Sequence, residues 1–346
     1  MASARHFGTT FSGRRGSRTN PVKGHARYGN FTARLAVTVP MPIIEQLATP
    51  ETTHKAREVE GVLDLYFYRK IGYWLAQVFA RLKITPAGVS LLGCLCGVMA
   101  GHLYFYRNLG INVAGMALHV CANALDNADG QLARLTGAGS REGRIIDSLA
   151  DHLVFLSIYI HLALRYLVEG ASPLVCLLAI AAGISHALQG AAADYYRTSY
   201  LYFVKGKSFM DLDSSAALRS DYQGLSWSDH PWHKLLLALY WNFTRQQEML
   251  SPHLKRLREI SIRSFPQGIP EWFRIRYQRV ARPMFRLWGL LMTNARMLIL
   301  FIVLFIAQPF WYFWIEVTVF NALLTYLIYR QECMAQSLLE LATTTR

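Results

Sequence analysis

The sequence has little charge. Only 17% of its 346 residues are Asp, Glu, Lys or Arg, and 53% are hydrophobic. An average soluble protein has about 25% charged residues. The hydrophobic residues gather into blocks of about 20 residues, which is the length that crosses the hydrocarbon core of a bilayer. Both observations argue against an ordinary soluble domain and predict a membrane protein.

Acidic residues are scarcer than basic ones. The chain has 22 Asp and Glu against 36 Lys and Arg, a net charge of +14. In a soluble protein such an excess would first indicate a nucleic-acid partner. Here 13 of the basic residues precede residue 84, and 15 lie between Arg197 and Arg286, outside the apolar blocks. This distribution is typical of the cytoplasmic side of a membrane protein, so we expect no nucleic-acid partner.

Cysteines are few, and their spacing has no pattern. They show neither the paired spacing of metal ligands nor a disulfide framework, and four of them fall within apolar blocks. We interpret them as packing residues and infer no redox compartment from them. The five are Cys94, Cys96, Cys121, Cys176 and Cys333.

The N-terminal region lacks acidic residues altogether. Residues 1–44 contain no Asp or Glu but seven Lys or Arg, with many Gly, Ser and Thr. Because such a segment cannot bury enough apolar surface to become ordered, we expect residues 1–60 to form a disordered basic extension. The composition also fits an organelle transit peptide, whereas the lack of an early apolar segment argues against a cleaved secretory signal.

The hydropathy pattern predicts an all-α, polytopic membrane protein. Residues 62–82 are helical in period, rich in aromatic residues and partly basic, which predicts an N-terminal amphipathic helix in the headgroup layer. Six membrane spans are expected to follow and form a bundle. An even number of spans puts both termini on one side, and the basic loops place that side in the cytoplasm. The expected spans are residues 86–106, 110–132, 145–164, 172–193, 287–306 and 309–329.

The spans divide the chain into further parts. We expect a catalytic membrane core at residues 61–196, the last two spans at 287–330 and a C-terminal tail at 331–346. Residues 197–286 form a basic insertion that is too long for a simple connection. Its mixed apolar and charged stretches predict either amphipathic helices on the inner membrane surface or a cap over the active site.

Four aspartates interrupt the edges of two apolar blocks. Asp126 and Asp129 are three residues apart. Asp147 and Asp151 are four apart, so each pair projects from one face of a helix. If the two helices are antiparallel neighbours joined by the loop 137–140, all four carboxylates converge. Such hard oxygen ligands suit Mg²⁺ or Mn²⁺, and two divalent ions would offset four charges that are otherwise costly at membrane depth.

Small residues are interspersed with these acids. Gly130, Ala133 and Gly143 could serve close helix packing, which is common in membranes. They could also leave room for a flat nucleotide beside the metal ions, and we favour this interpretation because they alternate with the acids. Arg134 would offset the acids or bind the nucleotide phosphate, with a structural ion pair as the alternative.

The complete pattern resembles the signature of the CDP-alcohol phosphatidyltransferase family. It reads Asp-x-x-Asp-Gly-x-x-Ala-Arg at residues 126–134 and Gly-x-x-x-Asp-x-x-x-Asp at residues 143–151, with every fixed position filled. The resemblance is strongest over residues 60–195. The tail before residue 45 and the segment 197–286 depart from the family.

The resemblance implies a reaction in which an alcohol attacks a CDP-linked donor and CMP leaves. It implies that Asp126, Asp129 and Asp147 are metal ligands. Asp151 would be the general base and could also touch a metal ion. The donor would be CDP-diacylglycerol or a CDP-amino alcohol, and the expected six spans weakly favour CDP-diacylglycerol. The family resemblance is also compatible with a homodimer.

Two arginines are weaker candidates for binding a phosphate or the acceptor. Arg296 lies two turns inside the fifth expected span, a costly position that suggests a partner. That partner would be a lipid or acceptor phosphate, or else one of the site acids, unless the span begins later than expected. Arg197, beyond the fourth span, would bind a phosphate or anchor the chain at the interface. Glu316 is expected to be a structural partner.

Two other functions fit parts of the pattern. An intramembrane prenyltransferase also uses two Asp-rich motifs and Mg²⁺, but its first motif needs a further Asp near position 133, where this chain has Ala133. A cation transporter also clusters acids within the membrane. Here, however, the acids lie at the ends of expected spans, and the chain has no matching inverted half. We therefore favour the phosphotransferase.

Overall fold

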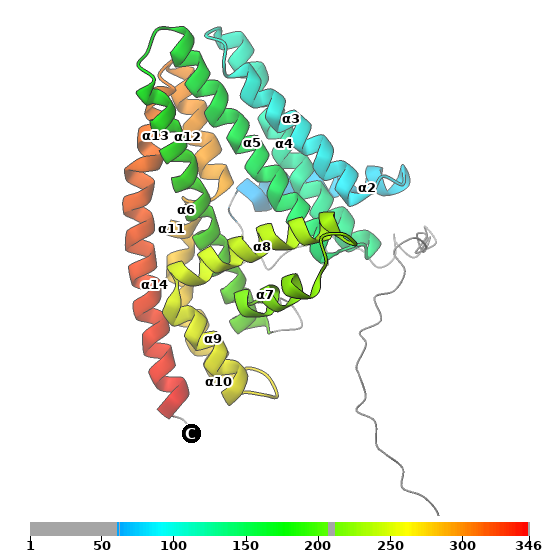
Figure 1. Ribbon diagram of the computed structural model, residues 1–346, viewed down its shortest axis with the longest axis vertical. Helices are drawn as coiled ribbons and strands as arrows, with labels where there is room; N and C mark the ends of the chain where they lie inside the picture. The colour runs from blue at the N-terminus through cyan, green and yellow to red at the C-terminus, as the bar shows by residue number, and fades with distance from the viewer. Residues whose placement is uncertain (1–60, 62, 207–211, 345–346) are drawn as a thin grey trace, which may run out of the picture. The chain divides into compact units, whose positions relative to one another are not determined.

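The computed structural model describes residues 61, 63–206 and 212–344, and these residues form helices without any strand. The predicted all-α fold is thereby confirmed (Figure 1). The basic extension predicted for residues 1–60 lies outside the described residues. All five cysteines are free thiols.

The helices begin and end as follows in chain order. They are η2 (Asp64–Tyr68), α2 (Arg69–Arg81), α3 (Pro86–Leu103), α4 (Leu109–Thr136), α5 (Arg141–Val168), α6 (Leu174–Lys205), α7 (Ser215–Gly224), α8 (Pro231–Leu250), α9 (Pro252–Ser264), α10 (Glu271–Ala281), η3 (Arg282–Met284), α11 (Phe285–Gly289), α12 (Thr293–Phe305), α13 (Phe310–Val317) and α14 (Val319–Thr344).

Five helical segments are long and apolar enough to cross a membrane, and the chain is an integral membrane protein. The helix α4 is also long, but polar residues interrupt it and it does not reach the same hydropathy. Five of the six expected spans therefore correspond to such a segment. The five are Pro86–Leu103, Glu142–Val168, Leu174–Lys205, Glu271–Phe305 and Phe310–Thr343.

The helix α2 crosses α4 and covers one side of it (Figure 1). Gly72 makes this crossing close, because a Cβ there would lie 3.1 Å from the backbone of Asn127. Beside it, the Gln131 side-chain amide donates a hydrogen bond to the Arg69 carbonyl at 3.1 Å. Most of the region expected to form an amphipathic helix is thus helical, and it is fastened to the helix that carries two of the aspartates.

The helix α3 joins α4 to α5. A Cβ on Gly93 would lie 3.3 Å from Leu125 Cβ on α4, and one on Gly101 would lie 2.6 Å from Ser157 Oγ on α5. Small residues therefore let α3 approach both helices closely. The helices α4 and α5 are antiparallel, as expected, but they barely touch each other, because α3 rather than direct contact holds them together.

The last two spans differ in detail from the expected ones. The helix α12 begins at Thr293, six residues later than the expected start at residue 287, because the chain turns at residues 290–292. The sixth span breaks at Thr318 (φ −107°, ψ −69°), between α13 and α14. The helix α14 then continues to Thr344, through most of the region expected to be a tail.

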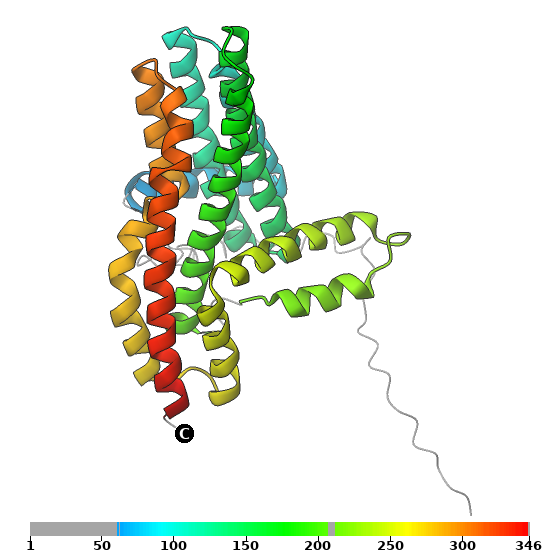
Figure 2. The ribbon, with the colours of Figure 1, turned by 60° about the vertical axis from the view of Figure 1, so that its left-hand side comes forward.

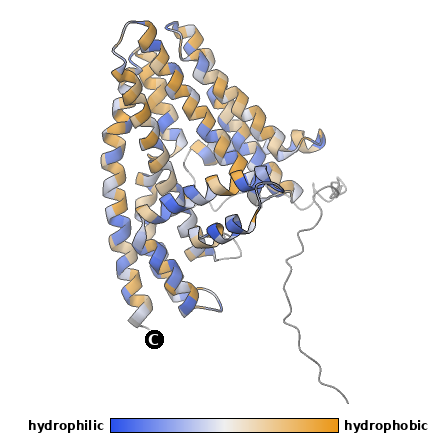
Figure 3. Ribbon diagram, in the orientation of Figure 1, coloured by the Kyte–Doolittle hydropathy of each residue, from blue (hydrophilic) through white to orange (hydrophobic). Residues whose placement is uncertain are grey.

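The insertion is helical and contains α7 to α10. Figures 1 and 2 show α8 crossing the direction of the long helices, with α7 beside it. Glu332 of α14 holds the start of α9, since its carboxylate accepts hydrogen bonds from the backbone nitrogens of His253 at 2.7 Å and Leu254 at 3.4 Å. Figure 3 shows hydrophilic residues gathered on α7, α9 and the end of α14, and hydrophobic residues along the other parts of the long helices.

Candidate active site

Three of the four predicted aspartates converge. One carboxylate oxygen from each of Asp126, Asp129 and Asp147 lies within 4.8 Å of the other two. The helix α4 supplies the first two, and the second turn of α5 supplies the third. Asp151, one turn further along α5, lines the same pocket and is exposed. The structure thus brings the whole predicted set into one pocket, with the first three as a group that could hold a metal ion.

The pocket lies between α4 and α5 and is lined at the back by α3. Asp129 is only 4% exposed. The Ser90 hydroxyl of α3 donates a hydrogen bond to its Oδ2 at 2.5 Å, which fixes the orientation of the carboxylate. Our sequence analysis missed Ser90. A hydroxyl one turn into an apolar span, four residues after Pro86, is the signal that could have identified it.

The short connection between α4 and α5 sets the two pairs of acids opposite each other. Gly137 ends α4 in the left-handed conformation (φ 64°), which favours glycine because it has no Cβ. Ser140 begins α5, and its hydroxyl accepts a hydrogen bond from the Gly143 backbone nitrogen at 2.9 Å. Such a cap satisfies one of the free donors in the first turn of a helix.

Helix packing does not explain two of the small residues in the motif. A Cβ on Gly130 would meet only the Arg134 guanidinium, at 3.6 Å, among the described residues. A Cβ on Gly143 would meet only Ser140 Oγ, at 3.1 Å, within the same part of the chain. Neither glycine touches the backbone of a neighbouring helix, in contrast to the glycines of α3.

The other predicted site residues lie around the pocket or apart from it. Ala133 is half-buried and Arg134 is exposed in the last turn of α4. Arg197 lies on α6, where its guanidinium pairs with the Asp194 carboxylate at 3.0 Å. Gln247 of α8 donates to the same carboxylate at 3.2 Å. Arg197 is therefore part of a contact between α6 and the insertion.

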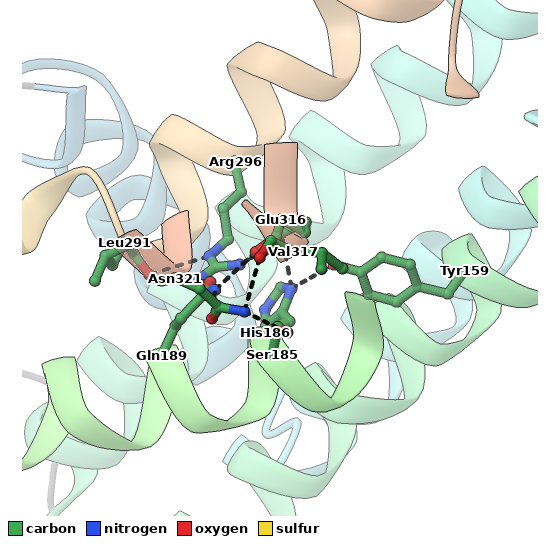
Figure 4. Close-up of polar contacts among 9 residues, drawn as sticks. All are labelled: Tyr159, Ser185, His186, Gln189, Leu291, Arg296, Glu316, Val317 and Asn321. Atoms are coloured by element: carbon green, nitrogen blue, oxygen red, sulfur yellow. Dashed lines mark hydrogen bonds and ion pairs between the residues drawn. The ribbon is translucent and has the colours of Figure 1, made fainter. Parts of the chain in front are cut away.

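Arg296 lies in a separate buried network, shown in Figure 4. It is in the first turn of α12 and is 1% exposed. Its guanidinium donates to the Glu316 carboxylate at 2.5 Å, to the Gln189 carbonyl oxygen at 2.6 Å and to the Leu291 backbone carbonyl at 3.0 Å. Two of the alternatives weighed above are therefore seen together, a later helix start and an ion pair, although the partner is not a site acid.

The same network satisfies the helix break between α13 and α14. The Gln189 amide donates to the Glu316 backbone carbonyl at 3.0 Å and to Asn321 Oδ1 at 2.8 Å. The Asn321 amide donates to the Val317 carbonyl at 3.0 Å and to Ser185 Oγ at 2.9 Å (Figure 4). Side chains thereby occupy carbonyls near the break, where a continuous helix would use backbone donors.

The start of α12 connects this network to the pocket. Thr293 lines the pocket together with the aspartates. Its neighbour Asn294 accepts a hydrogen bond from the Asn123 side chain at 2.8 Å, one turn before Asp126 on α4. Arg296 is one turn further along α12, so the ion pair holds a helix that contributes to the pocket wall.

Comparisons with known proteins agree with this geometry. Residues 83–210 match the family model described as CDP-alcohol phosphatidyltransferase. Over 95 residues the chain is 37% identical to an archaetidylinositol phosphate synthase of Pyrococcus horikoshii, a match that covers 28% of this chain and 49% of the relative. Over 102 residues it is 30% identical to a phosphatidylinositol phosphate synthase of Mycobacteroides abscessus, covering 28% of this chain and 42% of the relative.

These matches concern one part of each protein. The aligned segments span less than half the length of either relative. The family model covers α3 to α6, and three of these helices, α3, α4 and α5, line the aspartate pocket. Residues 83–210 of the chain are thus similar to the CDP-alcohol phosphatidyltransferase family.

Proposed function

We propose that the protein is a metal-dependent CDP-alcohol phosphotransferase of phospholipid synthesis. It would transfer a phosphatidyl group from CDP-diacylglycerol to an alcohol and release CMP. The observation that carries this proposal is the convergence of Asp126, Asp129 and Asp147, with Asp151 in the same pocket. Each of the four occupies a position that the family signature requires.

The donor set suits a hard divalent cation. Three carboxylates whose oxygens lie within 4.8 Å are ligands that Mg²⁺ and Mn²⁺ prefer. Their charges are costly to gather beside apolar helices unless cations offset them. Two divalent ions held by Asp126, Asp129, Asp147 and Asp151 would balance four negative charges and, when bound, would polarise the diphosphate of the donor.

Asp151 suits the role of general base. It would accept the proton of the acceptor hydroxyl while the hydroxyl oxygen bonds to the phosphorus that carries the lipid. The bond from this phosphorus to the bridging oxygen of the diphosphate would break, and CMP would leave with that oxygen. The exposed position of Asp151, beside the more enclosed Asp129, supports its access to an incoming alcohol.

The small residues of the motif suit a nucleotide. The space beside Gly130 and Gly143 is open to anything that approaches from outside the bundle, because no neighbouring helix backbone closes it among the described residues. The small side chain of Ala133 adds little bulk to the same surface. Arg134 would place its guanidinium near the phosphate of the nucleotide. Phosphate roles for Arg197 and Arg296 stay predictions, and each would require its present ion pair to open.

The names of the relatives indicate which acceptor to test first. Both are named as synthases of an inositol phosphate lipid, so inositol phosphate is the first candidate acceptor. The apolar helices around the site support a lipid donor. The start of α5 also lies beside the basic insertion, since His233 of α8 contacts Glu142 at 2.9 Å. This proximity supports a pocket that opens on the cytoplasmic side, together with both termini.

The test is an assay of CMP release by the full chain in nanodiscs with Mg²⁺. CDP-diacylglycerol would be offered with inositol phosphate, glycerol phosphate or serine, and CDP-choline with diacylglycerol. We expect CMP release with CDP-diacylglycerol, its loss in Asp151→Asn and no loss in Asp229→Asn, a change in an exposed aspartate of the insertion.

Other outcomes would overturn the proposal. Release of diphosphate from a prenyl diphosphate, without CMP release from any donor, would assign the site to a prenyltransferase. Metal flux into proteoliposomes without CMP chemistry would assign it to a transporter. The particle mass in the same preparation would test the expected homodimer.

A further inference from the structure

Four exposed arginines lie along one face of the helical segment that leads into α12. Arg276 and Arg279 belong to α10, Arg282 to η3 and Arg286 to α11. Successive spacings of three, three and four residues keep their side chains on one side of a helix. We call these four residues the arginine stripe.

The arginine stripe has no acidic partner within the described part of the chain. Other arginines of the insertion are paired, as Arg258 is with Glu248 at 3.7 Å and Arg197 with Asp194 at 3.0 Å. The segment from Arg197 to Arg286 contains 15 Lys and Arg but only seven Asp and Glu, so too few acids are present to neutralise the face. The stripe is an accessible positive surface that suits an anionic partner.

The position of the stripe along the chain indicates where this partner lies. Residues from Glu271 to Phe305 form one of the segments able to cross a membrane, and the apolar part follows the stripe directly. Arg286 lies on α11, seven residues before the start of α12, and Arg276 lies on α10, seventeen residues before it. The stripe thus extends away from the apolar layer and begins at its edge.

The neighbouring helix α8 supports a membrane surface at this level. Figures 1 and 2 show α11 at about the same height as α8, which crosses the direction of the long helices. On α8, Trp232 is 60% exposed and Leu235 is 41% exposed, and Leu239 is exposed on the same side. Exposed tryptophan and leucine on a helix that crosses the bundle are typical of the interfacial layer of a bilayer.

We propose that the arginine stripe binds anionic lipid headgroups of the leaflet at this end of the bundle. A guanidinium pairs with a phosphate through two parallel hydrogen bonds, and it remains charged at any physiological pH. Attraction to an anionic surface falls off within a Debye length of about 8 Å, so Arg282 and Arg286 contribute more than Arg276 and Arg279. This surface does not depend on the reaction that the aspartate pocket performs.

The experiment measures lipid selectivity of the full chain in phosphatidylcholine vesicles. The probes are spin-labelled phosphatidylserine and spin-labelled phosphatidylcholine, and the measured quantity is the fraction of each that the protein immobilises. A basic residue near an anionic surface contributes up to about a fivefold preference, so we expect Arg282→Gln/Arg286→Gln to reduce the selectivity for phosphatidylserine several-fold. High salt should reduce the selectivity of the unmodified protein in the same direction.

Two variants control for net charge and for folding. Arg256→Gln/Arg263→Gln removes the same charge from exposed positions on α9, outside the stripe, and should change the selectivity much less. Arg282→Lys/Arg286→Lys keeps the charge and should retain most of the selectivity. The unfolding temperature of each variant would be measured in the same vesicles.

Several results would overturn the proposal. An unchanged selectivity in Arg282→Gln/Arg286→Gln, or an equal loss in the α9 control, would show that the stripe is not the lipid site. A change in particle mass without a change in lipid selectivity would instead assign the stripe to a contact between copies of the chain. Loss of bound RNA as the sole effect would assign it to a nucleic acid.

Discussion

Two clusters of charged side chains lie among the apolar helices, and they differ in the side chains that compose them. The aspartate pocket between α4 and α5 is lined by four carboxylates and, among the described residues, by no Lys or Arg. The second cluster, on α6, α12, α13 and α14, pairs one cation with one anion, Arg296 with Glu316. It adds the amides of Gln189 and Asn321, which connect to the helix break.

The difference separates two uses of charge at membrane depth. A cluster that is balanced by its own side chains can hold helices together without any ligand, although its desolvation makes it a poor source of stability. A group of close carboxylates suits a divalent cation, and such a cation would couple the fold to a ligand. The Arg296 cluster would thus position α12, whereas the aspartate pocket would perform the chemistry.

The largest effect is expected when the balanced cluster loses one charge. Arg296→Met leaves Glu316 buried without its partner, and a broken buried pair costs about 3–5 kcal/mol of unfolding free energy. Arg296→Met/Glu316→Leu removes both charges and should recover much of that loss. Denaturation in detergent micelles would measure both values. A double variant as unstable as the single one would contradict a simple ion-pair role.

A change in the aspartate pocket should instead reduce activity and leave the fold intact. Asp129→Asn removes a proposed metal ligand, and even changes outside the ligand shell cost roughly 10–100-fold in metal affinity or activity. We expect at least this loss in CMP release, with an unfolding temperature close to that of the unmodified protein. The assay of the proposed reaction measures the loss, with Asp229→Asn as the matched control. Full activity in Asp129→Asn would show that the reaction does not need this carboxylate.

Removing charge from the aspartate pocket should stabilise the metal-free protein, whereas removing one charge from the Arg296 cluster should destabilise it. Because the carboxylates repel one another, Asp126→Asn/Asp147→Asn should raise the unfolding temperature in the presence of a chelator. Mg²⁺ should raise the unfolding temperature of the unmodified protein and have little effect on the variant. Thermal unfolding with and without Mg²⁺ measures both. A variant that is less stable than the unmodified protein in the chelator would show that the contacts of these acids outweigh their mutual repulsion.

A smaller effect is expected from the hydroxyl that holds Asp129. Ser90→Ala removes its hydrogen bond, and loss of such an outer partner reduces metal affinity roughly tenfold or more. The Mg²⁺ concentration that gives half of the maximal rate would measure this change. Ser157→Ala is the matched control, because its hydroxyl also links two helices but joins α5 to α3 through the Val98 carbonyl, away from the aspartates. An equal shift in both variants would indicate a general loosening of the helices.

The smallest effect concerns a third charge, Glu248 of α8, outside the spans. Burial alone would raise the pKa of Glu248, but hydrogen bonds from Lys255 and Ser215 outweigh it and lower the pKa. The stabilisation is therefore present above the unfolded-state pKa of about 4.3 and is lost as the pH falls through the lower folded-state value. Because Ser215 is the first residue of α7, proteolysis of α7 should increase as the pH falls over this range. In Glu248→Gln, cleavage should already be faster at neutral pH and change less on acidification.

Local spacing was sufficient to predict much of the candidate site. Pairs of acids three and four residues apart share a face of any helix, so Asp126 with Asp129 and Asp147 with Asp151 were expected to project together. A loop of four residues also makes its two helices antiparallel. The apolar blocks identified most of the spans for the same reason, since hydropathy depends on composition within about 20 residues.

Contacts between distant parts of the chain decided the rest. That Glu316 is the partner of Arg296 depends on how α12 packs against α13, 20 residues away in sequence, and on Gln189 of α6, which is 107 residues away. That Ser90 holds Asp129 depends on glycines that let α3 approach α4. The sequence by itself thus determined which charges share a helix face, because that is set by 3.6 residues per turn. Only the tertiary structure decided which of these charges are balanced by a neighbour, because side chains from separate helices become partners only when the helices pack.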